Sequence, residues 1–105
     1  MVLIPFPFSD LSNSKLRPAV VLAASGRGDW VLCQITSHPY SDARSIAIET
    51  DDLRSGALRL RSYARPSKLF TANEALITRV IGDLTGVKRS EVLTGVISLF
   101  QGALP

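Results

Sequence analysis

Cysteine and histidine are nearly missing from this sequence, and each shortage excludes a class of protein. The single cysteine, Cys33, cannot form an internal disulfide, which fits a reducing cytoplasmic compartment. The single histidine, His38, has no carboxylates at ligand spacing around it, so we expect no metal site and no Ser-His-Asp triad. Cys33 falls inside an expected strand, where a buried and inert thiol is the usual state. His38 is expected at the surface, or lining the same groove as Thr36, which it follows by two positions.

Long apolar runs are also absent. No stretch of about 18 apolar residues is present, so we expect no membrane-spanning helix. The apolar N-terminus has no basic residue before it and is interrupted by Pro5 and Pro7, so it predicts no signal peptide. The glycines of residues 25–29 fit a hairpin turn rather than a phosphate-binding loop, and we expect no cofactor. With 105 residues, of which 46% are hydrophobic, the chain is expected to form one domain over residues 1–105.

Basic residues exceed acidic ones, and the excess is unevenly distributed. The formal net charge is +3 and the isoelectric point is near 9.5. A local block over residues 54–68 contains no acid and five basic residues: Arg54, Arg59, Arg61, Arg65 and Lys68. Such a block suits a polyanion or an acidic protein partner, and a solvated basic face is the alternative interpretation.

Short apolar and β-branched runs, separated by Gly, Pro and Asn, predict a series of short strands. Residues 62–70 contain Pro66, so they predict either an edge strand or a strand bent at that proline. Residues 51–56 predict a turn or one helical turn, and residues 71–74 predict a turn. The remaining strands are expected over residues 1–4, 18–23, 30–35, 44–49 and around 79–84.

The C-terminal part has helical rather than strand spacing. Residues 89–99 predict an amphipathic helix of about three turns that packs over the open end of a barrel. Five to seven short strands followed by one helix favour a mainly β fold, a small barrel or sandwich. The expected apolar face holds Val92, Leu93, Val96, Ile97, Leu99 and Phe100, and the opposite face holds Glu91, Thr94, Gly95, Ser98 and Gln101.

Two polar residues are expected to meet at the open end of the first hairpin. Arg17 precedes the strand that starts at Pro18, and Thr36 ends the returning strand. Pairing these strands brings Arg17 near Thr36. A guanidinium beside a hydroxyl can bind a phosphate and stabilise charge that develops on it. An ion pair for the arginine and a turn cap for the threonine are the structural alternatives.

Four segments in order resemble one family. They are residues 2–11 (VLIPFPFSDL), 15–22 (KLRPAVVL), 33–37 (CQITS) and 65–71 (RPSKLFT), followed by residues 76–84 and the terminal helix. The chain resembles MazF/PemK/Kid-type toxins, the ribosome-independent mRNA endoribonucleases of type II toxin–antitoxin pairs. The resemblance implies a small SH3-like β-barrel with a C-terminal helix, usually a homodimer. It also implies metal-independent cleavage of single-stranded RNA and neutralisation by a cognate antitoxin, whose acidic segment covers the groove.

The resemblance assigns roles to individual residues. It implies that Arg17 stabilises the charge on phosphorus or protonates the leaving oxygen, and that Thr36 orients the phosphate. The 2′-OH of RNA would attack the adjacent phosphorus, leaving a 2′,3′-cyclic phosphate and a 5′-OH. The loop over residues 9–15 would border the RNA groove and move on binding. The implied RNA-binding residues are Phe6, Phe8, Lys15, Ser37, Arg65, Ser67 and Lys68.

One departure from that family keeps two alternatives open. Several members place an Arg and an Asp near the position of residues 70–73, where this chain has Phe70 and Asn73. A catalytically silent SH3-like module would instead bind RNA or a peptide through residues 54–68. A gyrase-inhibiting toxin on the same barrel is the other alternative, because related barrels share architecture without sharing targets.

Overall fold

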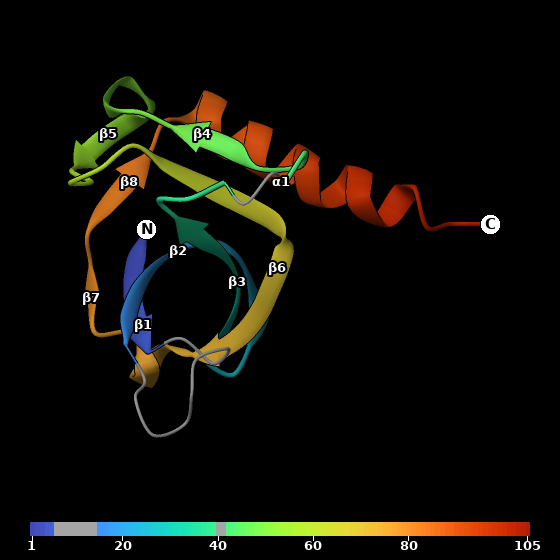
Figure 1. Ribbon diagram of the computed structural model, residues 1–105. Helices are drawn as coiled ribbons and strands as arrows, with labels where there is room; N and C mark the ends of the chain where they lie inside the picture. The colour runs from blue at the N-terminus through green and yellow to red at the C-terminus, as the bar shows by residue number, and fades with distance from the viewer. Residues whose placement is uncertain (6–14, 40–41) are drawn as a thin grey trace.

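The computed structural model describes residues 1–5, 15–39 and 42–105. Phe6, Phe8 and most of the expected loop over residues 9–15 lie outside these ranges. Within them the chain forms mainly strands, with one α-helix at its C-terminal end (Figure 1). The strands are β1 (Val2–Pro5), β2 (Leu16–Gly26), β3 (Asp29–Thr36), β4 (Ile46–Ile48), β5 (Leu53–Gly56), β6 (Ser62–Asn73), β7 (Arg79–Val80) and β8 (Gly82–Leu84). The helices are the 3₁₀ turns η1 (Thr50–Asp52) and η2 (Glu74–Leu76), and α1 (Gly86–Gln101).

The strands form one large curled sheet and a small second sheet. The six-stranded sheet has the order β4-β6-β3-β2-β1-β7, and β5 pairs with β8. Figure 1 shows the sheet wrapping around its own concave side. The expected mainly β class with a C-terminal helix is therefore confirmed. Among the described residues the edge strands β4 and β7 do not pair with each other, so hydrogen bonds do not close the sheet into a barrel.

Strand β3 is apolar on both faces because the sheet has a core on each side. Cys33 and Ile35 belong to the larger core, and Leu32 belongs to the smaller one, as the alternation of strand side chains predicts. Cys33 is fully buried, and this burial raises the pKa of its thiol to about 12. The larger core also contains Met1, Val20, Leu22, Ile48, Ala64, Leu84 and Val92; the smaller contains Val2, Ile4, Ala19 and Ala72.

Strand β6 settles the choice left open at Pro66. It lies between β4 and β3 and is therefore not an edge strand, but it is irregular at the proline. Cys33 pairs with Leu69 while the next residue, Gln34, pairs with Arg65, so residues 66–68 leave the ladder. A bulge accommodates proline because the missing N–H is not needed there.

Two expected turns are wrong in part. Residues 71–73 continue β6, because they pair with residues 29–31 of β3, and the 3₁₀ turn η2 follows only at Glu74. Residues 51–56 divide into the end of η1 and strand β5, which pairs with β8. In both places a distant strand provides hydrogen-bond partners that the local sequence does not reveal.

Helix α1 is longer than predicted, and its contact face differs. It begins after Thr85, whose hydroxyl accepts a hydrogen bond from the N–H of Lys88. A Cβ added to Gly95 would lie 3.1 Å from atoms of both Ile46 and Pro66, so this glycine faces the sheet and not the solvent. Its lack of a side chain permits the close crossing. Conversely, Ile97 and Phe100, assigned to the buried face, are 54% and 58% exposed.

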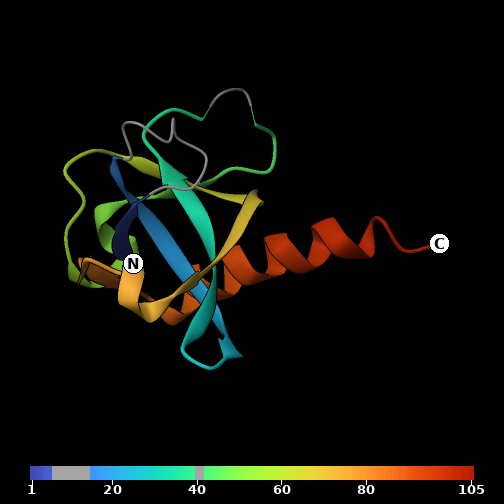
Figure 2. The ribbon, with the colours of Figure 1, turned by 90° about the horizontal axis from the view of Figure 1, so that it is seen from below.

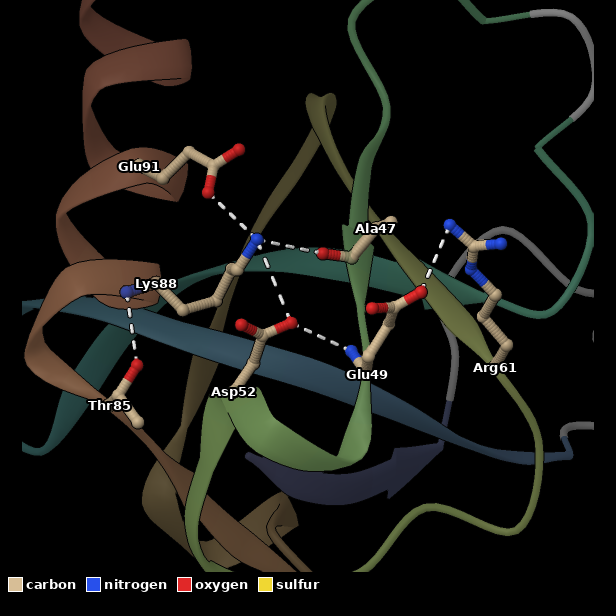
Figure 3. A network of polar contacts seen from close by, with 7 residues as sticks. All are labelled: Ala47, Glu49, Asp52, Arg61, Thr85, Lys88 and Glu91. Carbon is tan, nitrogen blue, oxygen red and sulfur yellow. Dashed lines mark hydrogen bonds and ion pairs between the residues drawn. The ribbon is translucent and has the colours of Figure 1, made fainter.

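Polar contacts attach the start of α1 to the sheets (Figure 3). The Nζ of Lys88 donates to the Ala47 carbonyl at 3.0 Å and lies 2.7 Å from a Glu91 carboxylate oxygen and 3.7 Å from one of Asp52. The guanidinium of Arg89 donates to two carbonyls of β2. From this anchored start the helix runs out past the strands, and the C-terminus lies away from them in both views (Figures 1 and 2). Among the described residues, no helix has the length and apolar character that crossing a membrane requires.

Candidate functional site

A groove of about 800 Å³ lies where several strand ends meet. Strands β1, β2, β3 and β7 and the first residue of β6 contribute to it, together with the segment over residues 57–60, which precedes β6 and is not a strand. Its described lining consists of Leu3, Arg17, Pro18, Ile35, Thr36, Ser37, His38, Ala57, Leu58, Arg59, Leu60, Ser62, Arg79, Val80 and Ile81.

Arg17 and Thr36 both line this groove. The β2–β3 pairing ends at Ala19 and Gln34, and continuing the same register by two residues along each strand sets Arg17 opposite Thr36. On its other side Arg17 pairs with Ile4 of β1. The pairing of the two strands therefore brings these two residues to the same end of the sheet.

The hydroxyl of Thr36 is held in position by a local turn. The residue is only 9% exposed, and its Oγ1 accepts a hydrogen bond of 3.1 Å from the backbone N–H of His38. A hydroxyl that accepts from the backbone retains its own proton for donation. Thr36 can therefore donate to an oxygen bound in the groove, while His38 is held at the groove wall by the same turn.

The groove lining is electropositive. Among the described residues it contains three arginines, Arg17, Arg59 and Arg79, and no Asp or Glu. No ion pair within the described ranges involves any of the three. Uncompensated guanidiniums at one concave surface raise the local concentration of anions and offer planar donors to phosphate.

Most of the basic residues in the block over residues 54–68 form ion pairs with acidic residues outside the groove. Arg54 pairs with Asp83, and Arg61 with Glu49, in exposed contacts of 3.8 and 3.2 Å. Only Arg59 of this block lines the groove. The acid partners come from other parts of the chain, which is why the block appears unbalanced in the sequence.

The other residues expected to bind RNA are scattered. Ser37 lines the groove, while Lys15 is exposed immediately before β2 and outside the lining. Arg65 forms an ion pair with Asp42, and Ser67 and Lys68 are exposed on the β6 bulge, also outside the lining. Phe6 and Phe8 fall outside the described residues.

Sequence reasoning missed Arg79 and overvalued the position of Asn73. Arg79 lies in a weakly patterned stretch, and only the pairing of β7 with β1 brings it to the groove. Asn73 pairs with Asp29, seven residues along β3 from Thr36, or about 23 Å at the rise of a strand. Its side chain caps η2 and donates to Asp29, so it has a structural role away from the groove. Within the described ranges no cluster of three His, Cys, Asp or Glu residues could hold a metal ion.

Comparison with known proteins decides the family. A family model described as PemK-like, MazF-like toxin of type II toxin-antitoxin system matches residues 1–100. The chain belongs to this toxin family. The match confirms the resemblance seen in the sequence, and no curated protein sequence matches this toxin.

Solved structures share the toxin's fold at low sequence identity. A mycobacterial endoribonuclease in complex with its cognate antitoxin has a TM-score of 0.72 at 14% identity, covering 99% of this chain and 91% of that chain. The toxin MazF-mt6 of Mycobacterium tuberculosis has a TM-score of 0.70 at 15% identity, covering 96% and 97%. Another mycobacterial endoribonuclease has a TM-score of 0.69 at 15% identity, covering 99% and 91%. These similarities establish a common fold.

Proposed function

We propose that this toxin is a metal-independent endoribonuclease that cleaves single-stranded RNA. The observation that carries the proposal is the groove that Arg17 and Thr36 both line, together with two more arginines, none of the three arginines having an ion pair among the described residues. Two structural neighbours named as endoribonucleases give further support. The lining offers what phosphoryl transfer needs most, which is positioning and stabilisation of negative charge.

The proposed reaction uses a nucleophile supplied by the RNA. The 2′-oxygen forms a bond to the adjacent phosphorus as the bond from phosphorus to the 5′-oxygen breaks. A proton leaves the 2′-OH and another is delivered to the 5′-oxygen, so the products are a 2′,3′-cyclic phosphate and a 5′-OH. No side chain becomes covalently attached, so a nucleophilic residue such as Cys33, buried in the core, is not required.

Arg17 and Thr36 have different tasks in this scheme. A guanidinium stays protonated in proteins, so of the two roles considered for Arg17 we assign it charge stabilisation and not proton donation. The Thr36 hydroxyl, fixed by the His38 N–H, donates to a non-bridging oxygen and orients the phosphate.

Proton transfer requires another group. His38 is the one residue of the described lining with an imidazole, a group that general acid–base catalysis uses often. Its backbone N–H binds the Thr36 hydroxyl, and the residue lines the same groove. We assign His38 to one of the two proton transfers.

The proposal also covers partners, assembly and location. An acidic segment of a cognate antitoxin would neutralise the toxin by occupying the electropositive groove. We further propose that the chain acts as a single domain, as a homodimer, in the cytoplasm. A structural neighbour solved with its cognate antitoxin is consistent with such a partner.

Incubation of the purified toxin with a long unstructured RNA in excess EDTA tests the proposal. Cleavage should leave cyclic-phosphate and 5′-OH ends, and Arg17→Ala should reduce the rate at least about 10²-fold, the scale of one lost charge-stabilising donor. Arg54→Ala, which removes an exposed arginine outside the groove, is the matched control and should cleave normally. RNA binding without any cleavage would contradict the enzyme and support the silent binding module.

A further inference from the structure

Arg79 has no role in the reaction described so far, although it lies in the same groove. It occupies β7, two strands away from Arg17 in the order β2-β1-β7. Leu3 of β1 pairs with Pro18 on one side and with Arg79 on the other. Two strand spacings place the backbones of Arg17 and Arg79 about 10 Å apart, and both residues line the groove.

The backbone of Arg79 is fixed on both sides. The N–H of Thr78 donates to the Leu3 carbonyl, and the N–H of Ile81 donates to the Met1 carbonyl, each at 2.9 Å. The two-residue strand between these bonds is therefore held rigidly against β1. Arg59 is less well placed, because residues 57–60 also line a second hollow of about 270 Å³ and form no strand.

The surroundings of Arg79 fit an RNA backbone with a base beside it. Val80 and Leu60 are 73% and 66% exposed, yet both line the electropositive groove. A groove that holds both exposed apolar side chains and a guanidinium offers a surface for an unpaired base and a donor for the phosphate attached to it. The described lining contains no Phe, Tyr or Trp, so the guanidinium plane also supplies a stacking surface.

We infer that Arg79 forms a second phosphate subsite, which binds a nucleotide neighbouring the cleaved bond and sets the path of single-stranded RNA across the groove. This inference rests on the proposed function and adds a binding residue that takes no part in the chemistry. Arg17 binds the phosphate that reacts, and Arg79 binds one that does not. Loss of Arg79 therefore weakens binding of the ground state and the transition state equally.

Equilibrium binding tests the inference without relying on cleavage. A fluorescent, fully 2′-O-methylated RNA oligonucleotide lacks the nucleophile, so it binds without being cut. Arg79→Gln should raise its Kd about tenfold, the scale of one charge-assisted hydrogen bond. The slope of log K against log salt should become shallower by about 0.7, the contribution of one phosphate on a single strand. Arg79→Lys should keep the slope, because it keeps the charge.

Cleavage kinetics separate a subsite from a structural role. With an unmodified RNA, Arg79→Gln should reduce kcat/KM mainly through KM, whereas Arg17→Ala should reduce kcat. Arg27→Gln is the control, because Arg27 is an exposed arginine in the β2–β3 hairpin turn, outside the groove lining. Its Kd and salt slope should match those of the wild type.

Three outcomes would overturn the inference. An unchanged Kd and salt slope in Arg79→Gln, with normal RNA binding by the wild type, would refute the subsite and leave the proposed function intact. Unchanged RNA binding with lost affinity for a polyglutamate peptide would assign Arg79 to a protein partner instead. No binding of the oligonucleotide by the wild type would refute the proposed function together with the subsite.

Discussion

Arg65 and Asp42 form an ion pair in which Nε lies 3.1 Å from Oδ2, and the two side chains are only 16% and 13% exposed. Asp42 also accepts a hydrogen bond of 2.9 Å from the N–H of Arg44. The pair joins the chain after β3 to strand β6. The guanidinium of Arg65 therefore supports the fold, which differs from the RNA-binding role that the resemblance implies for it.

The first prediction concerns the stability that this pair provides. The Arg44 N–H, and to a smaller extent Arg65, outweigh burial and lower the pKa of Asp42 below its usual value. A lowered folded-state pKa stabilises the protein above the unfolded pKa of about 3.9, and this stabilisation is lost as the pH falls through the folded value. Asp42→Asn should reduce the free energy of unfolding at pH 7 by about 2 kcal/mol, measured by urea denaturation.

The pH dependence distinguishes this effect from general damage. The difference between Asp42→Asn and the wild type should shrink as the pH falls below 4. Arg54→Gln breaks an exposed pair and should change the free energy of unfolding by less than about 0.5 kcal/mol. A difference that stays constant with pH would show that the carboxylate charge is not the source of the stability.

The second prediction concerns the closest approach of α1 to the sheet. A side chain at Gly95 would meet Ile46 and Pro66 at 3.1 Å. Gly95→Leu should therefore destabilise the fold by a net 1–2 kcal/mol or so, because overpacking outweighs the gain in helix propensity. Gly86→Ala, whose added Cβ meets no atom within 4 Å, is the matched control and should not destabilise. Equal stability of both variants in thermal unfolding would mean that the helix does not pack here.

The third prediction concerns the reactivity of Cys33. Its side chain is fully buried, and burial raises the pKa of the thiol to about 12. The thiolate, which is the reactive form, is then present at roughly one part in ten thousand at pH 8. Iodoacetamide should label the native protein slowly and the urea-unfolded protein quickly. Rapid labelling under native conditions would contradict the core position.

Local patterns predicted most of the fold, since they reflect short-range chemistry. The hairpin around residues 25–29 and the two faces of β3 follow from glycine turns and strand alternation. The continuation of β6 to Asn73 and the contact face of Gly95 depend on partners far away in the sequence. Neither partner leaves a signal in the local pattern.

The candidate site also has residues that the sequence could predict and residues that it could not. The hairpin register brings Arg17 and Thr36 together, so reasoning from strand ends could find them. Arg79 could not be found in this way, because it reaches the groove through the pairing of β7 with β1. The sequence suggested a continuous basic surface over residues 54–68, but three of its arginines have acid partners. These partners, Asp83, Glu49 and Asp42, lie outside the block in the sequence.

The fourth prediction concerns His38 in the proposed reaction. Its backbone N–H, not its side chain, holds the hydroxyl of Thr36, so His38→Gln preserves this hydrogen bond. The variant should reduce kcat by about 10²-fold through loss of a proton-transfer group, with a much smaller change in KM.

Comparison with Thr36→Val separates the contribution of Thr36 to the reaction from that of His38. Valine cannot accept from the His38 N–H or donate to phosphate, so this variant should lower kcat although the imidazole of His38 is still present. If His38→Gln kept the kcat of the wild type, the proton would pass through another group, and His38 would only line the groove.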